Sequence, residues 1–169
     1  MTSELEIAPI TPEDTLGVYA VIASAFGRKD EADLTVDLYR EDAAVLALAA
    51  RVDDAVIGAC VFSRATIETE DGARSAALLA PLAVAPALQR CGVGTGLVAE
   101  GLSLLGLAGE RIVLVLGDPA YYRRFGFSAK AAASVAAPWS GPAWQALALE
   151  GAAVPTGRGA FASAFERFG

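Results

Sequence analysis

The sequence predicts a single domain of the α/β class (α+β mixed), with a central mixed, mostly antiparallel sheet and helices on both faces. Three observations support this fold class. The chain has 169 residues, which suits one domain over 1–169. An Asp71-Gly72 pair, a strong hairpin signal, joins two long apolar runs. A glycine-rich helical pattern then separates two apolar runs, which predicts a right-handed β-α-β crossover.

The amino-terminal third is expected to hold one strand and two helices. Thr11-Pro12 is typical of a helix start, with a Thr cap and proline at the first helical position, and Gly27 is a typical stop. The charged residues 28–33 are expected to form a connection. The elements are therefore a strand over 5–10, a helix from 11 to 26, and a short second helix around Leu34 and Leu38 that ends before Ala43.

The middle of the chain predicts an antiparallel meander, and the pattern then changes. A continuous apolar run over 112–116 is typical of a strand that is buried on both faces and parallel to its neighbour. Asp118-Pro119 predicts another helix start, and the tail from Gly151 shows no clear periodicity. We expect strands over 45–52, 55–67 and 73–84, a helix over 94–105, strand 112–116, a short helix from Asp118 to Gly126, a strand from Phe127 and a strand over 144–149.

Composition excludes several functions. The chain has no histidine, so Ser-His-Asp, Cys-His and His-ligated metal sites are impossible. A formal net charge of −7 argues against a nucleic-acid or anionic-membrane surface, because both need clustered Lys and Arg. The acidic start lacks the apolar core of a signal peptide, and the longest apolar stretch, 76–88, is too short to span a bilayer. We therefore expect a cytoplasmic protein.

The two cysteines predict no metal site and no redox pair. Cys60 and Cys91 lie 31 positions apart and form no C-x-x-C pair. Free cysteines are commonly buried, so both are expected to be isolated buried thiols. We expect no bound metal.

The segment from Leu82 to Gly96, LAVAPALQRCGVGTG, is the first that indicates chemistry. A strand ends, a glycine-rich loop follows and a helix begins within it. Backbone N–H groups at a helix start favour an anion, and glycines let a ligand approach the backbone. The loop matches neither the P-loop nor the G-x-G-x-x-G dinucleotide motif. Close packing of the helix on the sheet is the alternative explanation for these glycines.

A second segment, LGDPAYYRRFGF over 116–127, follows the next buried strand. Together the two segments resemble the GNAT N-acetyltransferase superfamily, and in particular its bacterial YhbS-like branch. Gln89, Gly92 and Gly94 match the family pattern Gln/Arg-x-x-Gly-x-Gly/Ala. A Tyr four residues before a Gly-Phe pair closes the second motif, and Tyr122 stands there.

The resemblance implies a GNAT-like acyl-CoA N-acyltransferase fold with acetyl-CoA as co-substrate. It implies that the loop holds the pyrophosphate, that strand backbone holds pantetheine, and that Tyr122 protonates the departing thiolate. A packing role for Tyr122 is the alternative. The implied cofactor-binding residues are Leu82, Ala83, Val84, Gln89, Arg90, Cys91, Gly92, Val93, Gly94, Thr95, Gly117 and Tyr122.

Departures from the family pattern concern the second segment. Many GNAT enzymes carry an Asn seven residues before the Tyr, where this chain has Val115. Gly117 and Asp118 are candidates to replace its contact with pantetheine, although Asp118 also fits a helix N-cap. No general base is evident. The acidic residues Asp30, Glu31 and Asp33 stand where GNAT proteins often contact their acceptors, which is one interpretation of them. They are expected instead to lie in a charged surface turn.

The expected reaction is direct acetyl transfer to a primary amine of a small molecule or peptide. The main alternative is a catalytically silent CoA-binding regulatory or sensor domain with the same fold. Propionyl- or succinyl-CoA as donor, and a different nucleotide ligand, are further alternatives. No nucleic-acid or membrane partner is expected, and a homodimer is one option for the oligomeric state.

Overall fold

The computed structural model describes residues 3–168. The chain divides into two compact units, each of which is described by itself. One unit comprises Met1–Phe62 and Pro81–Leu104, and the other comprises Ser63–Ala80 and Leu105–Gly169. Strands β3 (Ala55–Thr69) and β4 (Gly72–Val84) contribute residues to both units. The grouping of 1–169 as one domain stays a prediction.

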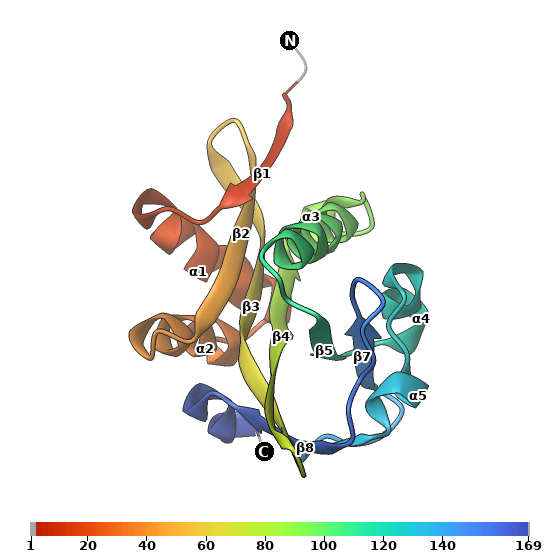
Figure 1. The fold of residues 1–169 in the computed structure, drawn as a ribbon. Helices are drawn as coiled ribbons and strands as arrows, with labels where there is room; N and C mark the ends of the chain where they lie inside the picture. Colours follow the sequence, from red (N-terminus) through yellow and green to blue (C-terminus); the bar gives the residue numbers. More distant parts are fainter. Residues whose placement is uncertain (1–2, 169) are drawn as a thin grey trace. The chain divides into compact units, whose positions relative to one another are not determined.

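The first unit starts as an antiparallel sheet (Figure 1). Strand β1 (Leu5–Pro9) pairs with β2 (Ala44–Val52), with Leu5 opposite Val52. The Asp53-Asp54 turn has positive φ at both residues, 50° and 66°, as a tight two-residue hairpin requires, and leads into β3. The strand predictions for 5–10 and 45–52 are confirmed within one residue.

The helices of the first unit begin and end at recognisable signals. A 3₁₀ turn, η1 (Pro12–Asp14), precedes α1 (Thr15–Phe26), and the backbone N–H of Thr11 donates to Asp14 Oδ2 at 2.8 Å. Gly27 ends α1 in the left-handed conformation, with φ 67°. The next helix, α2 (Asp30–Arg40), includes the last four residues of the segment 28–33 that was predicted as a charged connection. The prediction of a connection was therefore wrong for residues 30–33, because acidic residues in the first turn favour a helix start.

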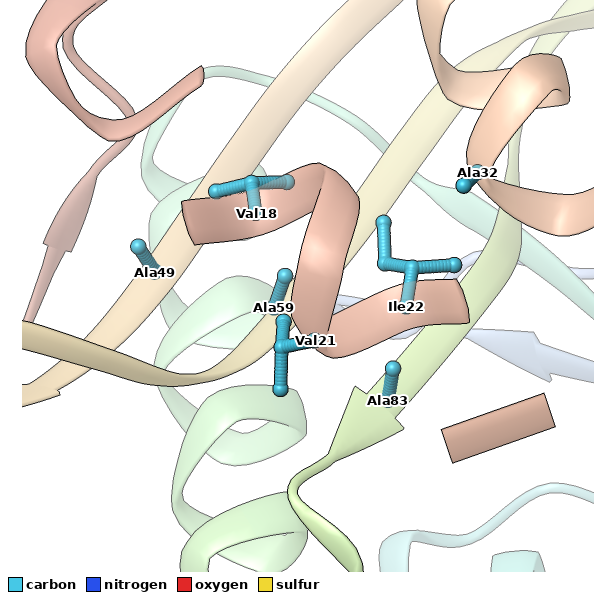
Figure 2. Close-up of a cluster of buried hydrophobic side chains, with 7 residues drawn as sticks. All are labelled: Val18, Val21, Ile22, Ala32, Ala49, Ala59 and Ala83. Atoms are coloured by element: carbon cyan, nitrogen blue, oxygen red, sulfur yellow. The ribbon is translucent and has the colours of Figure 1, made fainter. Parts of the chain in front are cut away.

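Figure 2 shows how α1 packs on the sheet. Val18, Val21 and Ile22 of α1 face small side chains from α2 and three strands. Each of the three strands contributes an alanine to this buried cluster, which lets the helix backbone lie close to the sheet. The complete buried cluster is Val18, Val21, Ile22, Ala32, Ala49, Ala59 and Ala83.

 Helix α3 (Val93–Leu107), which follows the 3₁₀ turn η2 (Pro86–Leu88), covers the other face of the same strands. A Cβ on Gly58 of β3 would lie 3.2 Å from Val93 and 3.1 Å from Leu97, whereas the next residue, Ala59, belongs to the α1 cluster. Because successive strand residues point to opposite faces, α1 and α3 cover opposite faces of the sheet in this unit. The predicted helices on both faces are confirmed here.

Gly101 fixes the distance between α3 and β3. A Cβ at this position would lie 2.7 Å from Cζ of Phe62, whose side chain is completely buried. We expect Gly101→Ala to lower the free energy of unfolding by about 1–3 kcal/mol, as overpacked cores do. Urea denaturation measures this change. Gly106→Ala in the same helix is the control, because its nearest atom would lie 3.6 Å away; an equal loss there would contradict the packing argument.

The second unit contains the parallel strand pair that the sequence predicted. Strand β5 (Ile112–Leu116) runs parallel to β4, with Leu78 opposite Leu114, and antiparallel to β7 (Trp144–Ala148). Parallel and antiparallel pairs therefore occur together, and the predicted mixed sheet is confirmed. Short helices follow β5: α4 (Pro119–Tyr122), the 3₁₀ turn η3 (Arg123–Phe125) and α5 (Ala129–Ala132).

One expectation for the second unit was wrong, and the tail, for which no element was predicted, is structured. The predicted strand from Phe127 ends after one extended residue, Ser128, which forms an antiparallel bridge with Ala146. Helix α5 then follows, because Ser128 Oγ accepts from the Ala131 N–H at 3.1 Å and caps it, and the short strand β6 (Val135–Ala136) comes after the helix. The tail, which showed no periodicity, contains β8 (Gly157–Phe161) and the 3₁₀ helix η4 (Ser163–Phe168). Strand β8 pairs antiparallel with β3 and parallel with β6.

Candidate active site

The end of β4, the loop after it and the first turn of α3 hold ten of the twelve predicted cofactor-binding residues, and these ten lie in the first unit. Two residues of the loop have left-handed backbone conformations: Arg90, with φ 65°, and Gly92, with φ 87°. The Gly96 N–H donates to the Gly92 carbonyl at 3.0 Å, which closes the first turn of α3. The loop is thus a sharp reversal that ends directly in a helix amino terminus.

The side chain of Gln89 fastens this loop to the strand before it. Its Nε2 donates to the carbonyl oxygen of Val84 at 3.0 Å, across the 3₁₀ turn η2. The strand end is held on its other side as well, since the Ala85 N–H donates to the Ile57 carbonyl at 2.8 Å. Gln89 therefore shapes the loop through its amide, which is a structural contact that the motif alone did not predict.

The amino end of α3 suits an anion such as a pyrophosphate. The first N–H groups of a helix have no acceptor within the helix, and here the first two belong to Val93 and Gly94. The helix dipole adds partial positive charge at this end. The exposed Arg90 supplies a full positive charge within the same loop. The donor set fits the phosphate groups of a nucleotide cofactor.

The strand residues that precede the loop alternate as a strand should. Ala83 is 3% exposed and belongs to the core beneath α1, whereas Leu82 and Val84 are half-buried. Their side chains therefore point to the opposite face from Ala83. The backbone of all three residues is in β4, as predicted.

The two cysteines differ from each other. Cys60 is fully buried, and burial raises the pKa of its thiol well above the usual range. Cys91 is exposed in the loop, where its Sγ lies 3.6 Å from the Gln89 carbonyl oxygen. The prediction of a buried thiol is confirmed for Cys60 and wrong for Cys91, because the loop that carries Cys91 lies on the surface.

The other predicted residues, Gly117 and Tyr122, lie together in the second unit. Asp118 Oδ1 accepts from the Ala120 N–H at 2.9 Å, so Asp118 is the N-cap that the Asp-Pro pair indicated. One turn later, Tyr122 is 8% exposed and packs edge-on against Phe127, with ring centroids 5.8 Å apart. A Cβ on Gly117 would lie 3.0 Å from Cδ2 of Tyr122, so the ring occupies the space that any side chain at 117 would need.

Val115, at the family's Asn position, is 1% exposed and offers no polar group. A buried polar side chain lies directly across the strand pair, because Gln145 of β7 is opposite Val115 in the register. Its Nε2 donates to the Gly117 carbonyl at 3.1 Å. Gln145 was not among the predicted site residues, because the one indication of its role in the sequence is a single amide in an otherwise apolar strand, WQALA.

The acidic residues near the start of α2 are partnered, and the expected charged surface turn was wrong. Glu31 is 7% exposed and accepts from Arg28 Nε at 2.8 Å. Asp33 accepts from the Tyr19 hydroxyl at 2.6 Å, and this hydrogen bond raises the pKa of the Tyr19 phenol. These carboxylates lie in the first turn of α2 and not in a surface turn between elements.

The two tryptophans are packing residues. Trp144 is 2% exposed, and its Nε1 donates to the Val135 carbonyl at 3.0 Å. Trp139 packs against Trp144 and Phe161, with ring centroids 5.8 Å and 4.9 Å away. Arg158 in the tail forms an ion pair with Glu68, with 3.3 Å between its guanidinium nitrogen and the carboxylate oxygen.

Comparison with known proteins identifies the family. The family model of the acetyltransferase (GNAT) domain matches residues 6–129. The chain is 40% identical to the uncharacterized N-acetyltransferase YjhQ of Escherichia coli K12 over 116 residues, which is 68% of this chain and 64% of YjhQ. The match therefore spans less than two thirds of YjhQ. This chain is also 37% identical to the uncharacterized N-acetyltransferase YhbS of Escherichia coli K12, over 77% of each of the two chains.

Two solved structures agree with this assignment. The crystal structure of a GNAT family acetyltransferase from Brucella melitensis in complex with acetyl-CoA has a TM-score of 0.83 and 32% identity, over 96% of this chain and 98% of that one. Escherichia coli YhbS in complex with CoA has a TM-score of 0.87 and 32% identity, over 100% and 96% of the two chains. Within residues 3–168, no helix has the length and apolar character needed to cross a membrane. The chain belongs to the GNAT acetyltransferase family, and its relatives support the YhbS-like branch.

Proposed function

We propose that this protein is an N-acetyltransferase that transfers the acetyl group of acetyl-CoA directly to a primary amine. The observation that carries the proposal is the loop over 89–95, where a sharp backbone reversal presents the amino end of α3. The Brucella relative binds acetyl-CoA and Escherichia coli YhbS binds CoA, which supports the same co-substrate here.

In this proposal the first unit supplies the binding groups for the cofactor. The backbone N–H groups from Arg90 to Thr95 donate to the pyrophosphate, and the Arg90 guanidinium adds charge. The backbone of Leu82, Ala83 and Val84 takes the pantetheine arm as an added strand would be taken. A backbone N–H there also stabilises the oxyanion that forms during transfer.

Tyr122 of the second unit is proposed as the general acid. The amine nitrogen forms a bond to the acetyl carbon, the carbon–sulfur bond breaks, and the Tyr122 phenol gives its proton to the departing thiolate. The proton that the amine loses goes to water, which later reprotonates the phenolate. No protein nucleophile takes part, so the absence of histidine from the sequence is no obstacle.

Thermal unfolding with acetyl-CoA tests the binding proposal. Acetyl-CoA at 100 times its Kd is expected to stabilise the protein by about 2.7 kcal/mol, whereas ATP and NAD are expected to give no comparable shift in Tm. Absence of a shift at millimolar acetyl-CoA would contradict the proposal, and the glycines of the loop would then serve packing alone.

A matched pair of glycine variants assigns the binding to the loop. Gly92 and Gly72 both have positive φ, 87° and 114°, and a Cβ at either position meets no atom within 4 Å. Both alanine variants therefore carry similar backbone strain. We expect Gly92→Ala to lose most of the acetyl-CoA shift and Gly72→Ala to keep it, and equal losses would contradict the assignment.

The acceptor is proposed to be a small-molecule or peptide amine. The formal net charge of −7 favours a cationic acceptor. Release of the CoA thiol across a panel of primary amines tests this, with propionyl- and succinyl-CoA compared as donors. Acetyl-CoA binding without thiol release for any amine would favour a silent CoA-binding domain.

A further inference from the structure

Gln145 is a completely buried polar side chain to which the proposed mechanism gives no role. Its Nε2 uses both hydrogens on main-chain carbonyls, with Gly117 at 3.1 Å and Ala143 at 3.3 Å. Two carbonyl acceptors at one end fix which end of the amide carries the nitrogen. At the other end, Oε1 is buried without a hydrogen-bond partner among residues 3–168.

This arrangement is costly for a residue that only fills space. A buried acceptor without a partner keeps its desolvation penalty, and an apolar side chain of the same length would avoid it. The neighbouring position across the strands is Val115, so the surroundings already accommodate apolar groups. The gain from Gln145 must therefore come from the two carbonyls that it binds.

One of those carbonyls belongs to the residue against which Tyr122 packs. The Gly117 N–H donates to the Ala143 carbonyl at 3.0 Å, and the Gly117 carbonyl accepts from Gln145. Both polar groups of the Gly117 backbone are thus held by the segment 143–145. The ring of Tyr122 lies where a side chain on Gly117 would be, so any shift of this backbone moves the surface under the ring.

We propose that Gln145 is a positioning residue, which holds the Gly117 backbone and thereby sets where the Tyr122 phenol lies. The inference rests on the proposed role of Tyr122 in acetyl transfer. Gln145 acts through Gly117 and does not itself touch the reacting atoms. It fills this role from β7, 28 residues along the chain from Gly117.

Gln145→Met tests the proposal, because Met keeps the length of the side chain and removes both N–H donors. In protein labelled with ¹³C at the tyrosine rings, loss of a signal in Tyr122→Phe assigns Tyr122. We expect Gln145→Met to shift the Tyr122 signal and to leave those of Tyr19 and Tyr39 unchanged. Tm is expected to change little, because removal of the unpaired Oε1 offsets the loss of the hydrogen bonds to the two carbonyls.

Ser63→Ala is the matched control. Ser63 is also fully buried in the second unit, and its Oγ also lacks a partner among the residues described. Its removal is expected to leave the Tyr122 signal in place. An unchanged Tyr122 signal in Gln145→Met would overturn the proposal. So would failure of both Gln145→Met and Gln145→Leu to fold, because Gln145 would then be a structural residue.

Kinetics separate this inference from the proposed function. With an amine that is turned over, Gln145→Met is expected to lower kcat by roughly 10- to 100-fold, as misplaced catalytic groups do, with little change in KM for acetyl-CoA. In the Tyr122→Phe background the same change is expected to have no further effect. An additive effect would overturn the positioning role. If Tyr122→Phe alone keeps its kcat, the acid role fails, while the ring signal still reports on Gln145.

Discussion

Replacement of Tyr122 by Phe is expected to lower kcat for acetyl transfer by about 10²–10⁴-fold, the usual contribution of a general acid. The variant loses only the phenolic oxygen. The ring contacts with Phe127 and Gly117 involve carbon atoms, so the fold and acetyl-CoA binding are expected to survive. Steady-state kinetics with a primary amine that is turned over measure kcat, and the Tm shift with acetyl-CoA measures binding.

Tyr121→Phe is the matched control for this prediction. Tyr121 is the preceding residue on α4, and residues one apart on a helix point about 100° apart. Its ring packs edge-on against Tyr122 and lies under the Arg124 guanidinium, 4.4 Å from the ring centroid. Tyr121→Phe is expected to keep kcat near the wild-type value. A loss of about 10-fold or less in Tyr122→Phe would argue instead that Tyr122 only packs over the cofactor.

The features that could be predicted from the sequence depend on neighbouring residues. The hairpin at Asp71-Gly72, the Gly27 stop and the Asp118 cap each need only a short stretch of chain, and each is confirmed. The glycine-rich loop is another such local feature, because its backbone reversal depends on residues that are consecutive in the sequence.

The features that were missed depend on distant partners. Strand β8 contains Gly157 and Gly159, which are weak strand formers, yet a Cβ on Gly157 would lie 2.9 Å from the backbone carbon of Glu68. Glycine is therefore needed for β8 to approach β3, which the local pattern cannot reveal. Gln145 was missed for the same reason, because its partner Gly117 is far away in the sequence.

The largest expected effect on stability comes from Arg51→Met in the first unit. Arg51 Nε donates to Asp14 Oδ1 at 2.9 Å, and its NH2 group binds the second oxygen. The side chains are only 12% and 9% exposed, so the variant leaves a buried carboxylate without its cation. We expect a loss of about 3 kcal/mol in the free energy of unfolding, the low end for a broken buried pair.

Urea denaturation at pH 7 measures this loss, and Arg40→Met is the control. Arg40 lies 3.7 Å from Asp37 in a pair whose side chains are 77% and 30% exposed. Exposed pairs contribute about 0–1 kcal/mol, so the control is expected to lose little. Comparable losses in the two variants would mean that the burial of the Asp14 pair adds nothing to its strength.

The same pair predicts how stability depends on pH. The Arg51 hydrogen bonds hold the pKa of Asp14 far below its usual range; burial opposes this shift, and donors from Thr11 add to it. Because the unfolded chain binds this proton more readily, the contribution of Asp14 is complete above its unfolded pKa of about 4 and is lost as the pH falls below it. The gap in unfolding free energy between wild type and Arg51→Met should therefore narrow between pH 6 and pH 3. Over this range the unfolded wild-type chain takes up the proton while the ion pair keeps Asp14 ionised in the folded state, whereas Asp14 of the variant lacks that ion pair and can be protonated in the folded state as well. A gap that stays constant over this range would mean that Arg51 stabilises the fold through contacts other than its ion pair.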